Sequence, residues 1–219
     1  MTPKSFQLSP EVHEYLLAHS TPPDRVLAAL IDETAALGGI SRMQVAPEQG
    51  ALLTILTRLV HATAAVEVGT FTGYSSLCIA SGLADGGRLL CCDVSEEWTE
   101  VARRHWDSAG VADRIDLVVA PAIDTLRALP NDPHLDLAFV DADKGGYVSY
   151  VDELVPRLRP GGLLLIDNVL WSGAVADPAD DDPDTVAIRL CNDRVAADER
   201  LEVAMIPVAD GLTVAYRRA

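Results

Sequence analysis

The sequence predicts an α/β protein with a Rossmann-like, seven-stranded, mostly parallel doubly wound sheet, N-terminal helices and a C-terminal antiparallel hairpin. Three observations predict this fold. Short apolar segments alternate with helical segments from residue 64 onward, a pattern typical of parallel strands that are buried on both faces. Residues before that point have helical apolar spacing throughout. Near the C-terminus, two strand-like segments flank Ala209-Asp210-Gly211, and Asp-Gly between such segments indicates a hairpin.

The N-terminal part predicts three helices. Ser9 followed by Pro10 has the form of a helix cap with proline in the first turn. A second helix follows Thr21-Pro22-Pro23, ends at Gly38-Gly39, and has apolar residues at helical spacing: Val26, Leu27, Leu30, Ile31 and Leu37. A third helix begins near Pro47, and we expect it to bury Leu52, Leu53, Leu56, Leu59 and Val60.

The alternating part predicts strands over residues 64–69, 88–94, 114–120, 135–143 and 161–170. The helices between them are predicted over residues 75–84, 96–110, 123–129 and 147–158, and the hairpin strands over 201–208 and 212–218. No repeat or linker divides the chain. We therefore expect a single domain over 1–219, with an N-terminal helical segment (1–62) and a Rossmann-like core (63–219).

Charge and composition restrict the partners. The chain has 17 Lys and Arg against 33 Asp and Glu, a formal net charge of −16. Binding to nucleic acid or to an anionic membrane needs basic side chains, so neither partner is expected. The four cysteines form no C-x-x-C pair, and no signal pattern or membrane-length apolar run is present. A cytoplasmic location and small-molecule partners follow as expectations.

A glycine-containing turn follows the first predicted strand. Gly69 and Gly73 make G-x-x-x-G, which differs from the G-x-G-x-x-G of dinucleotide sites and lacks the end of a P-loop. Glu67 disfavours phosphate and suits an ammonium group, and Asp93 at the next strand end can accept ribose hydroxyls. S-adenosylmethionine has these features: a ribose, no phosphate and a cationic amino-acid end. The alternative is that the turn and Asp93 are purely structural.

Two later strands end in oxygen-bearing side chains. Asp141 and Asp143 close the predicted fourth strand, and Asp167-Asn168 closes the fifth. Ligands of doubly wound sheets bind outside the carboxyl ends of the strands. We therefore expect Asp141, Asp167 and Asn168 to hold one hard cation, Mg²⁺, or else Ca²⁺ or Mn²⁺. Lys144 can relieve repulsion or accept a proton. Alternatively, Asp167 and Asn168 cap a loop and Asp141 pairs with Lys144.

An aspartate-rich segment follows this region. Residues 176–184 carry five aspartates and two prolines, ADPADDDPD. A solvated loop is the usual structure of such a charge run. A mobile lid over the second acidic strand end is the alternative.

The segments VEVGTFTGYSS, CCDVS, FVDADK and LLLIDNVLWSG, in that order, resemble the cation-dependent O-methyltransferases of the caffeoyl-coenzyme A and catechol type. MQVAPEQGALL resembles the segment before that family's first strand. The resemblance runs from about Met43 to the final hairpin. It implies a Rossmann-like methyltransferase fold, a homodimer, and methyl transfer from S-adenosylmethionine to a vicinal-dihydroxy, catechol-like phenol.

The resemblance also implies site residues. The S-adenosylmethionine contacts fall on Val45, Glu67, Gly69, Thr70, Ser75, Asp93, Ala122 and Asp143. The metal ligands fall on Asp141, Asp167 and Asn168, and the proposed catalytic base on Lys144, with Asp141 beside it. Met43, Tyr147, Trp171 and Ser172 are candidates for the acceptor pocket.

The chain departs from the family at two of these positions. Pro121 replaces a glycine before the adenine-contacting alanine and removes an N–H. Ser172 stands where plant relatives often have asparagine, so plant substrate specificity is not transferred. Three other functions remain open at this point: a nicotinamide dehydrogenase, a cation-independent methyltransferase, and a nucleoside-binding protein without catalysis.

Overall fold

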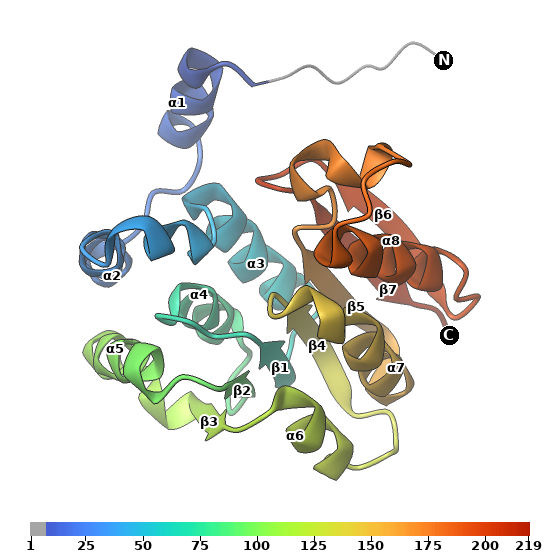
Figure 1. Cartoon of the computed structure of the whole chain (residues 1–219). Helices are drawn as coiled ribbons and strands as arrows, with labels where there is room; N and C mark the ends of the chain where they lie inside the picture. The colour runs from blue at the N-terminus through green and yellow to red at the C-terminus, as the bar shows by residue number, and fades with distance from the viewer. Residues whose placement is uncertain (1–7) are drawn as a thin grey trace.

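The computed structural model describes residues 8–219. The first seven residues, on which part of the expected absence of a signal segment rests, lie outside that range. The strands of the described chain are β1 (Ala64–Val68), β2 (Arg88–Asp93), β3 (Ile115–Val119), β4 (Leu135–Val140), β5 (Leu158–Asp167), β6 (Leu201–Ile206) and β7 (Leu212–Arg217). They form a sheet of order β3-β2-β1-β4-β5-β7-β6 (Figure 1).

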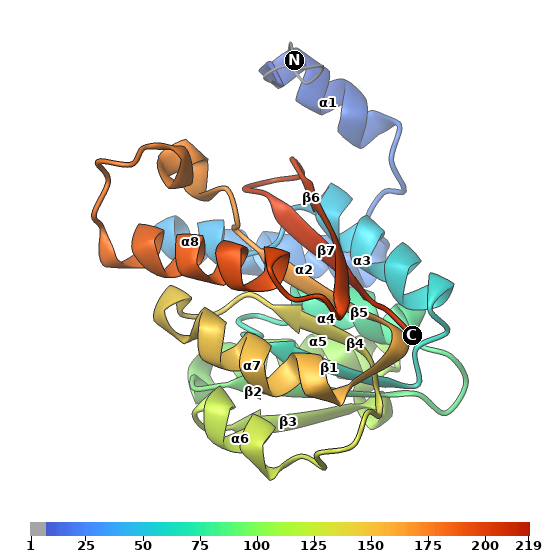
Figure 2. The same ribbon diagram turned by 90° about the vertical axis from the view of Figure 1, so that its right-hand side faces the viewer.

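Strand pairing confirms the predicted fold class. β1 pairs in parallel with β2 and β4, β2 with β3, and β4 with β5. β7 runs antiparallel to both β5 and β6, which makes the predicted C-terminal hairpin. The hairpin lies at one edge of the sheet, where Figure 2 shows its two strands side by side. The strand order reverses between β1 and β4. The chain after β1 therefore continues to a helix on one face of the sheet, and the chain after β4 continues to a helix on the other face.

The helices are α1 (Pro10–Ala18), α2 (Arg25–Ala35), α3 (Pro47–Leu59), α4 (Tyr74–Gly82), α5 (Glu96–Ala109), α6 (Ala122–Ala128), α7 (Tyr147–Arg157) and α8 (Pro183–Ala196). Short 3₁₀ segments cover Gly38–Met43, Ala112–Arg114, Lys144–Gly146 and Trp171–Ala176. Helices α2 to α5 cover one face of the sheet and α6 to α8 the other (Figure 1).

The two cores follow from the alternation of side chains along buried strands. All six residues of β4 are buried. Leu137 and Phe139 pack into the core with α2 to α5, whereas Ala138 and Val140 pack into the core with α6 to α8. Successive strand residues point to opposite faces, so an apolar strand supplies both cores at once. This is why the alternation of apolar runs and helices predicts the fold.

Local sequence signals set the helix starts. The Ser9 hydroxyl accepts the Val12 N–H at 3.4 Å at the start of α1, as predicted. Asp24 caps α2 by accepting the N–H groups of Val26 and Leu27, both at 2.9 Å. α1 buries none of its residues and stands apart from the sheet in both views (Figures 1 and 2).

Some expectations are wrong. Leu59 is 69% exposed, because it lies on the solvent face of α3, one turn after Ile55, which is 49% exposed. Leu37 is exposed and lies beyond the end of α2. Helix α8 falls outside the predicted alternation. It follows the aspartate-rich segment, where Asp182 caps it by accepting the Asp184 N–H at 3.0 Å. Between residues 8 and 219, no helix has the length and apolar character to cross a membrane.

Candidate active site

A cavity of about 1610 Å³ opens at the carboxyl ends of β1, β2, β4 and β5. It exceeds the roughly 300–1,000 Å³ of a pocket for one small ligand, so it has room for a cofactor and an acceptor together. Of the residues predicted for the site, Glu67 and Tyr147 do not line it. The others do: Met43, Val45, Gly69, Thr70, Ser75, Asp93, Ala122, Asp141, Asp143, Lys144, Asp167, Asn168, Trp171 and Ser172.

The turn after β1 is held tightly between its two neighbouring strands. Gly69 donates its N–H to Cys92 at 2.9 Å, and the Asp141 N–H bonds to Val68 at 2.8 Å. Gly69 has φ +89°, and a Cβ added there would lie 1.8 Å from the main-chain oxygen of Asp141. Only glycine therefore fits where β1 and β4 diverge. The predicted need for glycine in this turn has a steric cause in the strand beside it.

Asp93 ends β2 and fixes the same turn. One of its carboxylate oxygens accepts the N–H groups of Thr70 and Phe71, both at 2.8 Å. The other accepts the N–H groups of Val94 and Ser95, at 2.7 and 2.8 Å. The carboxylate lines the cavity while it ties the glycine turn to the start of α5. In this structure Asp93 thus has the structural role that was named above as the alternative to ribose binding, and it also lines the cavity.

Glu67 lies on β1 directly behind the turn and is fully buried. One carboxylate oxygen accepts the Thr70 hydroxyl at 3.0 Å and the Cys91 thiol at 3.4 Å. The other, Oε1, has no hydrogen-bond partner. Burial raises the pKa of Glu67 to about 7. Glu67 does not itself line the cavity, but it contacts Thr70, which does. A cationic group that reached Glu67 from the cavity would supply the missing partner, as expected for the ammonium group.

The two acidic strand ends meet as predicted. Lys144 donates to Asn168 Oδ1 at 2.7 Å and to Asp141 Oδ1 at 3.3 Å. These two oxygens contact one nitrogen, so they cannot be further apart than those two distances together. Asp167 directly precedes Asn168 and is 3% exposed. The contact between Asp141 and Lys144 is also the ion pair named above as the alternative.

The donor set suits a hard cation. Burial raises the pKa of Asp141, and burial followed by the charge of Asp141 raises the pKa of Asp167 to about 7. Two buried carboxylates that destabilise each other in this way are stabilised by a positive charge between them. Here the Lys144 ammonium supplies it. Within residues 8–219 no three His, Cys, Asp or Glu side chains gather as a metal site; the third donor predicted here is the Asn168 amide.

Two tyrosines from α7 reach this region. Tyr147 is fully buried and lies behind Lys144, whose ammonium donates to its hydroxyl at 2.6 Å. The same hydroxyl donates to the main-chain oxygen of Asp167 at 3.2 Å. The prediction that Tyr147 forms the acceptor wall is therefore wrong, because the residue faces the protein interior. Tyr150, one turn later, lines the cavity and donates to Asp143 at 2.6 Å.

Most non-glycine residues with a left-handed backbone conformation lie around the cavity. Within the described chain, six non-glycine residues have positive φ. Five of these six line the cavity: Phe71, Asn168, Trp171, Ser172 and Ala209. Left-handed conformations cost energy in non-glycine residues and cluster at functional sites. In particular, the left-handed turn at Asn168 follows β5 directly and leads into the segment that carries Trp171 and Ser172.

The aspartate-rich segment is exposed and anchored. The Arg189 guanidinium on α8 donates to the main-chain oxygens of Ala174 and Val175, at 2.9 and 3.0 Å, and to that of Asp180 at 2.7 Å. Asp180, Asp182 and Asp184 line the mouth of the cavity. Residues 177–182 are thus an exposed loop whose backbone is held by one arginine, and Pro183 and Asp184 already begin α8. The segment brings negative charge to the cavity.

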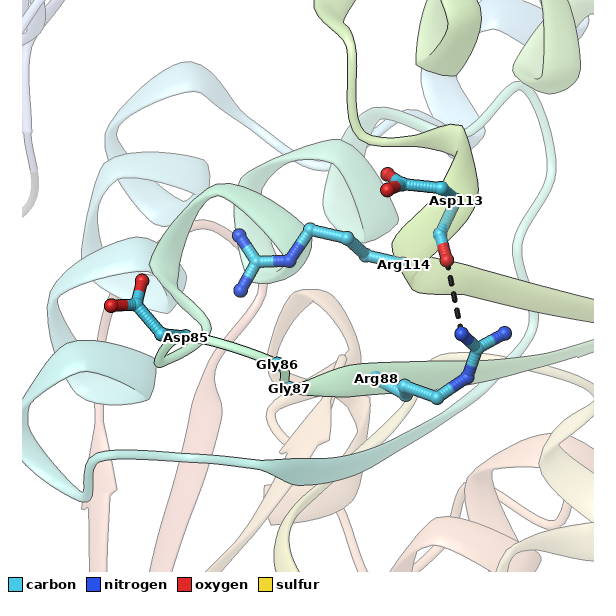
Figure 3. A pocket seen from close by; sticks show the side chains of 6 residues that line it. All are labelled: Asp85, Gly86, Gly87, Arg88, Asp113 and Arg114. Carbon is cyan, nitrogen blue, oxygen red and sulfur yellow. Dashed lines mark hydrogen bonds between the residues drawn. The ribbon is translucent and has the colours of Figure 1, made fainter.

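A second, smaller pocket of about 380 Å³ lies at the amino end of β2, opposite to the end that carries Asp93 (Figure 3). Its arginines are already engaged. Arg88 donates to the main-chain oxygen of Asp113 at 3.0 Å, and Arg114 donates to that of Leu83 at 3.0 Å. These bonds join the segment around the start of β2 to the segment before β3, and we assign the pocket no ligand.

Several residues that line the cavity are not predicted by the sequence. Tyr150 had a readable signal, since it lies three residues after Tyr147 on the same helix. Gln49 lies within the MQVAPEQGALL segment but has no strand-end position to mark it. Asp210 comes from the β6–β7 turn and accepts the Ser172 N–H across the cavity mouth. No pattern in the sequence connects residues so far apart.

Comparisons with known proteins agree with this geometry. A family model described as O-methyltransferase matches residues 17–218. "Probable caffeoyl-CoA O-methyltransferase 2" of Dictyostelium discoideum is 37% identical and covers 95% of this chain and 92% of its own. "Caffeoyl-CoA O-methyltransferase" of Petroselinum crispum is 35% identical over 98% and 93%. The structure of an O-methyltransferase from Bacillus cereus in complex with SAH superposes with a TM-score of 0.87 and 29% identity, covering 95% and 97%.

Proposed function

Because the chain belongs to the O-methyltransferase family, we propose that it transfers a methyl group from S-adenosylmethionine to a hydroxyl of a catechol-like phenol, with the help of a divalent cation. One observation carries the proposal. A single cavity brings the glycine turn after β1 together with the oxygen donors after β4 and β5. The turn suits the donor of the methyl group, and the oxygen donors suit the cation that would orient the acceptor.

The cofactor half would lie over the turn. The unpartnered Oε1 of Glu67 suits the ammonium group of the methionine moiety. The Asp93 carboxylate already accepts hydrogen bonds from backbone N–H groups. It would accept a further hydrogen bond from a ribose hydroxyl, or would accept that bond in place of one from a backbone N–H group. Val45, Gly69, Thr70, Ser75, Ala122 and Asp143 line the remaining cofactor surface. A relative crystallised with SAH supports this placement.

The cation half would lie at the two strand ends. Asp141, Asp167 and Asn168 would hold a cation such as Mg²⁺ and leave coordination positions for the two adjacent hydroxyls of a catechol. When bound, the cation acts as a Lewis acid and fixes the direction of the acceptor oxygen. Lys144 would have to leave its contacts with Asp141 and Asn168. Lys144 could accept the proton of the acceptor hydroxyl only as the neutral amine.

The reaction is an in-line displacement. When bound, S-adenosylmethionine supplies a methyl group on a positively charged sulfur. The acceptor oxygen attacks the methyl carbon, the carbon–oxygen bond forms while the carbon–sulfur bond breaks, and the bonding pair leaves on sulfur. The hydroxyl proton passes to Lys144. Holding donor and acceptor in line contributes up to roughly 7–11 kcal/mol, so positioning is the main task of these residues.

A cation-independent methyltransferase is the second candidate. The observation in its favour is the Lys144 ammonium, which already contacts Asp141 and Asn168 at the place where a cation would lie. In that case Lys144 alone would stabilise the developing oxygen charge.

Methyl transfer from S-adenosylmethionine to a panel of catechols and monohydric phenols, with Mg²⁺ or with EDTA, tests both candidates. We expect transfer to catechols only, and its loss in EDTA. Asp141→Ala should abolish turnover and leave binding of S-adenosylhomocysteine largely intact. Full activity in EDTA would favour the second candidate, and transfer to monohydric phenols at the same rate would contradict the catechol assignment.

A further inference from the structure

The hydroxyl of Thr34 makes a buried hydrogen bond to the glycine turn. Thr34 lies in the last turn of α2, and its hydroxyl donates to the hydroxyl of Thr72 at 2.8 Å. Thr34 is 1% exposed and Thr72 is fully buried. The two residues are 38 positions apart in the sequence. Thr72 lines the cavity and Thr34 does not, so a side chain outside the cavity contacts the turn.

The hydrogen bond does more than apolar packing would do at this place. A valine at either position would have nearly the shape of threonine, so filling the space does not require two hydroxyls. Both hydroxyls lose their contacts with water when the chain folds, and each therefore needs the other as a partner. A hydrogen bond depends on distance and direction, whereas apolar burial is non-directional. The bond thus specifies where Thr72 lies relative to α2.

Three consecutive residues of the turn are held by three different elements. Phe71 has φ +50°, and its N–H donates to the Asp93 carboxylate at the end of β2. Gly73 has φ +90°, and a Cβ added there would lie 2.5 Å from a side-chain carbon of α5. Thr72, between them, is held by Thr34 of α2. Strained backbone persists only where its surroundings fix it, so the contact from α2 supports the conformation of the turn.

Helix α2 is itself fixed, so it can hold the turn. Leu30 is fully buried in the core between α2 to α5 and the sheet. Glu33, the residue before Thr34, forms a hydrogen bond with His105 of α5 at 2.8 Å and pairs with Arg104 of the same helix. The end of α2 is therefore docked on α5 at the position next to the Thr34 hydroxyl.

Helix α2 also leads into a second part of the cofactor surface. After the helix, the chain passes through the 3₁₀ segment Gly38–Met43 and reaches Val45, which lines the cavity. Val45 and the glycine turn were both assigned to the cofactor above. The end of α2 thus connects to Val45 through the chain and to the turn through the Thr34 hydroxyl.

We propose that Thr34 is a positioning residue for the binding of S-adenosylmethionine, which acts through Thr72 to hold the glycine turn in its binding conformation. The proposal rests on the cofactor part of the proposed function and is independent of its cation part. Without the bond, the turn adopts the binding conformation for a smaller fraction of the time. The apparent affinity for the cofactor falls in proportion to that fraction.

Thr34→Val tests the proposal, since valine keeps the shape and removes the hydroxyl. The probe is S-adenosylhomocysteine, titrated calorimetrically into the full chain. We expect its Kd to rise about fivefold or more in Thr34→Val, the factor that corresponds to the loss of one hydrogen bond between neutral groups. Thr34→Ser keeps the hydroxyl and loses only a methyl group, so its Kd should stay within about twofold of the wild type.

Thr57→Val is the matched control for the loss of a buried hydroxyl. Thr57 is fully buried, and its hydroxyl donates to the main-chain oxygen of Leu53 in its own helix at 2.7 Å. It does not line the cavity. Thr57→Val should lower the thermal unfolding temperature, and its Kd for S-adenosylhomocysteine should stay within about twofold of the wild type.

The pair Thr34→Val and Thr72→Val tests whether Thr34 acts through Thr72. Because the two side chains share one bond, their effects on the Kd should not add. The double variant should bind S-adenosylhomocysteine no more weakly than the weaker of the two single variants. Losses that multiply in the double variant would overturn the proposal, since Thr34 would then act by another route.

Three further results would overturn it. The first is a Thr34→Val variant that binds S-adenosylhomocysteine like the wild type. The second is a Thr34→Ser variant that loses as much affinity as Thr34→Val, because the hydroxyl would then have no part in binding. The third is an equal loss of affinity in Thr57→Val, because that result would indicate general destabilisation.

The outcome is separable from that of the proposed function. If the variants behave as expected and the wild type transfers no methyl group to a catechol, the positioning role stands and the proposed reaction fails. If the wild type methylates a catechol and Thr34→Val binds S-adenosylhomocysteine like the wild type, the positioning role fails and the proposed function stands. A wild type that binds no S-adenosylhomocysteine overturns both.

Discussion

The hydroxyl of Tyr147 lies 2.6 Å from the ammonium nitrogen of Lys144. Because the same hydroxyl donates to the main-chain oxygen of Asp167, it connects the end of β5 to the proposed base on the turn after β4. The base is thus held by a fully buried side chain from α7. Lys144 also contacts Asp141 and Asn168, so its position depends on three different segments of the chain.

Tyr147→Phe removes this support without removing the ring. A hydrogen bond to a charged group contributes about 1.5–3 kcal/mol, so we expect kcat to fall roughly tenfold or more and the pH dependence of kcat to change. The KM for S-adenosylmethionine should hardly change. Tyr150→Phe is the control on the same helix. Its hydroxyl donates to Asp143, so the loss should appear in the KM for S-adenosylmethionine. Steady-state kinetics that show wild-type kcat in Tyr147→Phe would contradict the relationship.

Gly69→Ala should disrupt the turn between β1 and β4. The added Cβ would lie 1.8 Å from the Asp141 oxygen, and the residue has φ +89°. Gly86→Ala separates these two causes, because Gly86 has φ +74° with nothing within 4 Å of the added Cβ. A left-handed alanine alone costs roughly 1–2 kcal/mol. Chemical denaturation should therefore show a clearly larger loss of stability for Gly69→Ala than for Gly86→Ala, together with weaker binding of S-adenosylhomocysteine. Equal losses would show that strain at positive φ is the whole effect.

The affinity for S-adenosylmethionine should fall at low pH. Burial raises the pKa of Glu67 from 4.5 to about 7 in the free protein. Below pH 7 the carboxyl is protonated and must release its proton to pair with the ammonium group. Affinity should therefore weaken as pH falls from about 7, by up to roughly tenfold per pH unit. Calorimetric titrations at several pH values measure this. Glu67→Gln should bind more weakly and lose the dependence; a wild-type affinity that is constant between pH 7 and 5 would contradict the assignment.

Free catechols should be better acceptors than coenzyme A esters. Eight aspartates line the cavity against two cationic side chains, Arg42 and Lys144, and the phosphates of coenzyme A would be repelled. We expect kcat/KM for a neutral or amine-bearing catechol to exceed that for its coenzyme A ester at least about tenfold at low salt. The gap should shrink as added salt reduces the Debye length from about 30 Å at 0.01 M to about 10 Å at 0.1 M. Asp184→Asn, at the exposed mouth of the cavity, should narrow the gap as well. An ester preferred at low salt would contradict the electrostatic argument.

The strand ends of the site could be predicted because their positions follow from sheet geometry. Glu67, Asp93, Asp141 and Asp167 lie at or next to the carboxyl ends of apolar runs, and parallel strands bring those ends to one edge. Helix α8 could not be predicted in the same way. Few apolar residues mark it, and its start, Asp182 followed by Pro183, lies within an aspartate-rich run. The signal of a helix cap is hard to recognise where several neighbouring residues are also aspartates.

The direction in which a side chain points was decided by packing. Tyr147 and Tyr150 are both tyrosines of α7, yet only Tyr150 lines the cavity. Which tyrosine faces inward depends on the rotation of α7 against the sheet, and that rotation is set by the contacts of the whole helix. Leu59 is a similar case, since its exposure depends on which face of α3 meets α4.

The sequence by itself determined the alternation of strands and helices up to β5, the C-terminal hairpin, the glycine turn and the acidic strand ends, because these depend on local periodicity and on the fixed geometry of parallel strands. Only the tertiary structure decided that Lys144 reaches Asn168 and that Tyr147 lies behind Lys144. These relationships join residues from separate elements. They depend on how the helices dock onto the sheet, which is a property of the whole core and of no single segment.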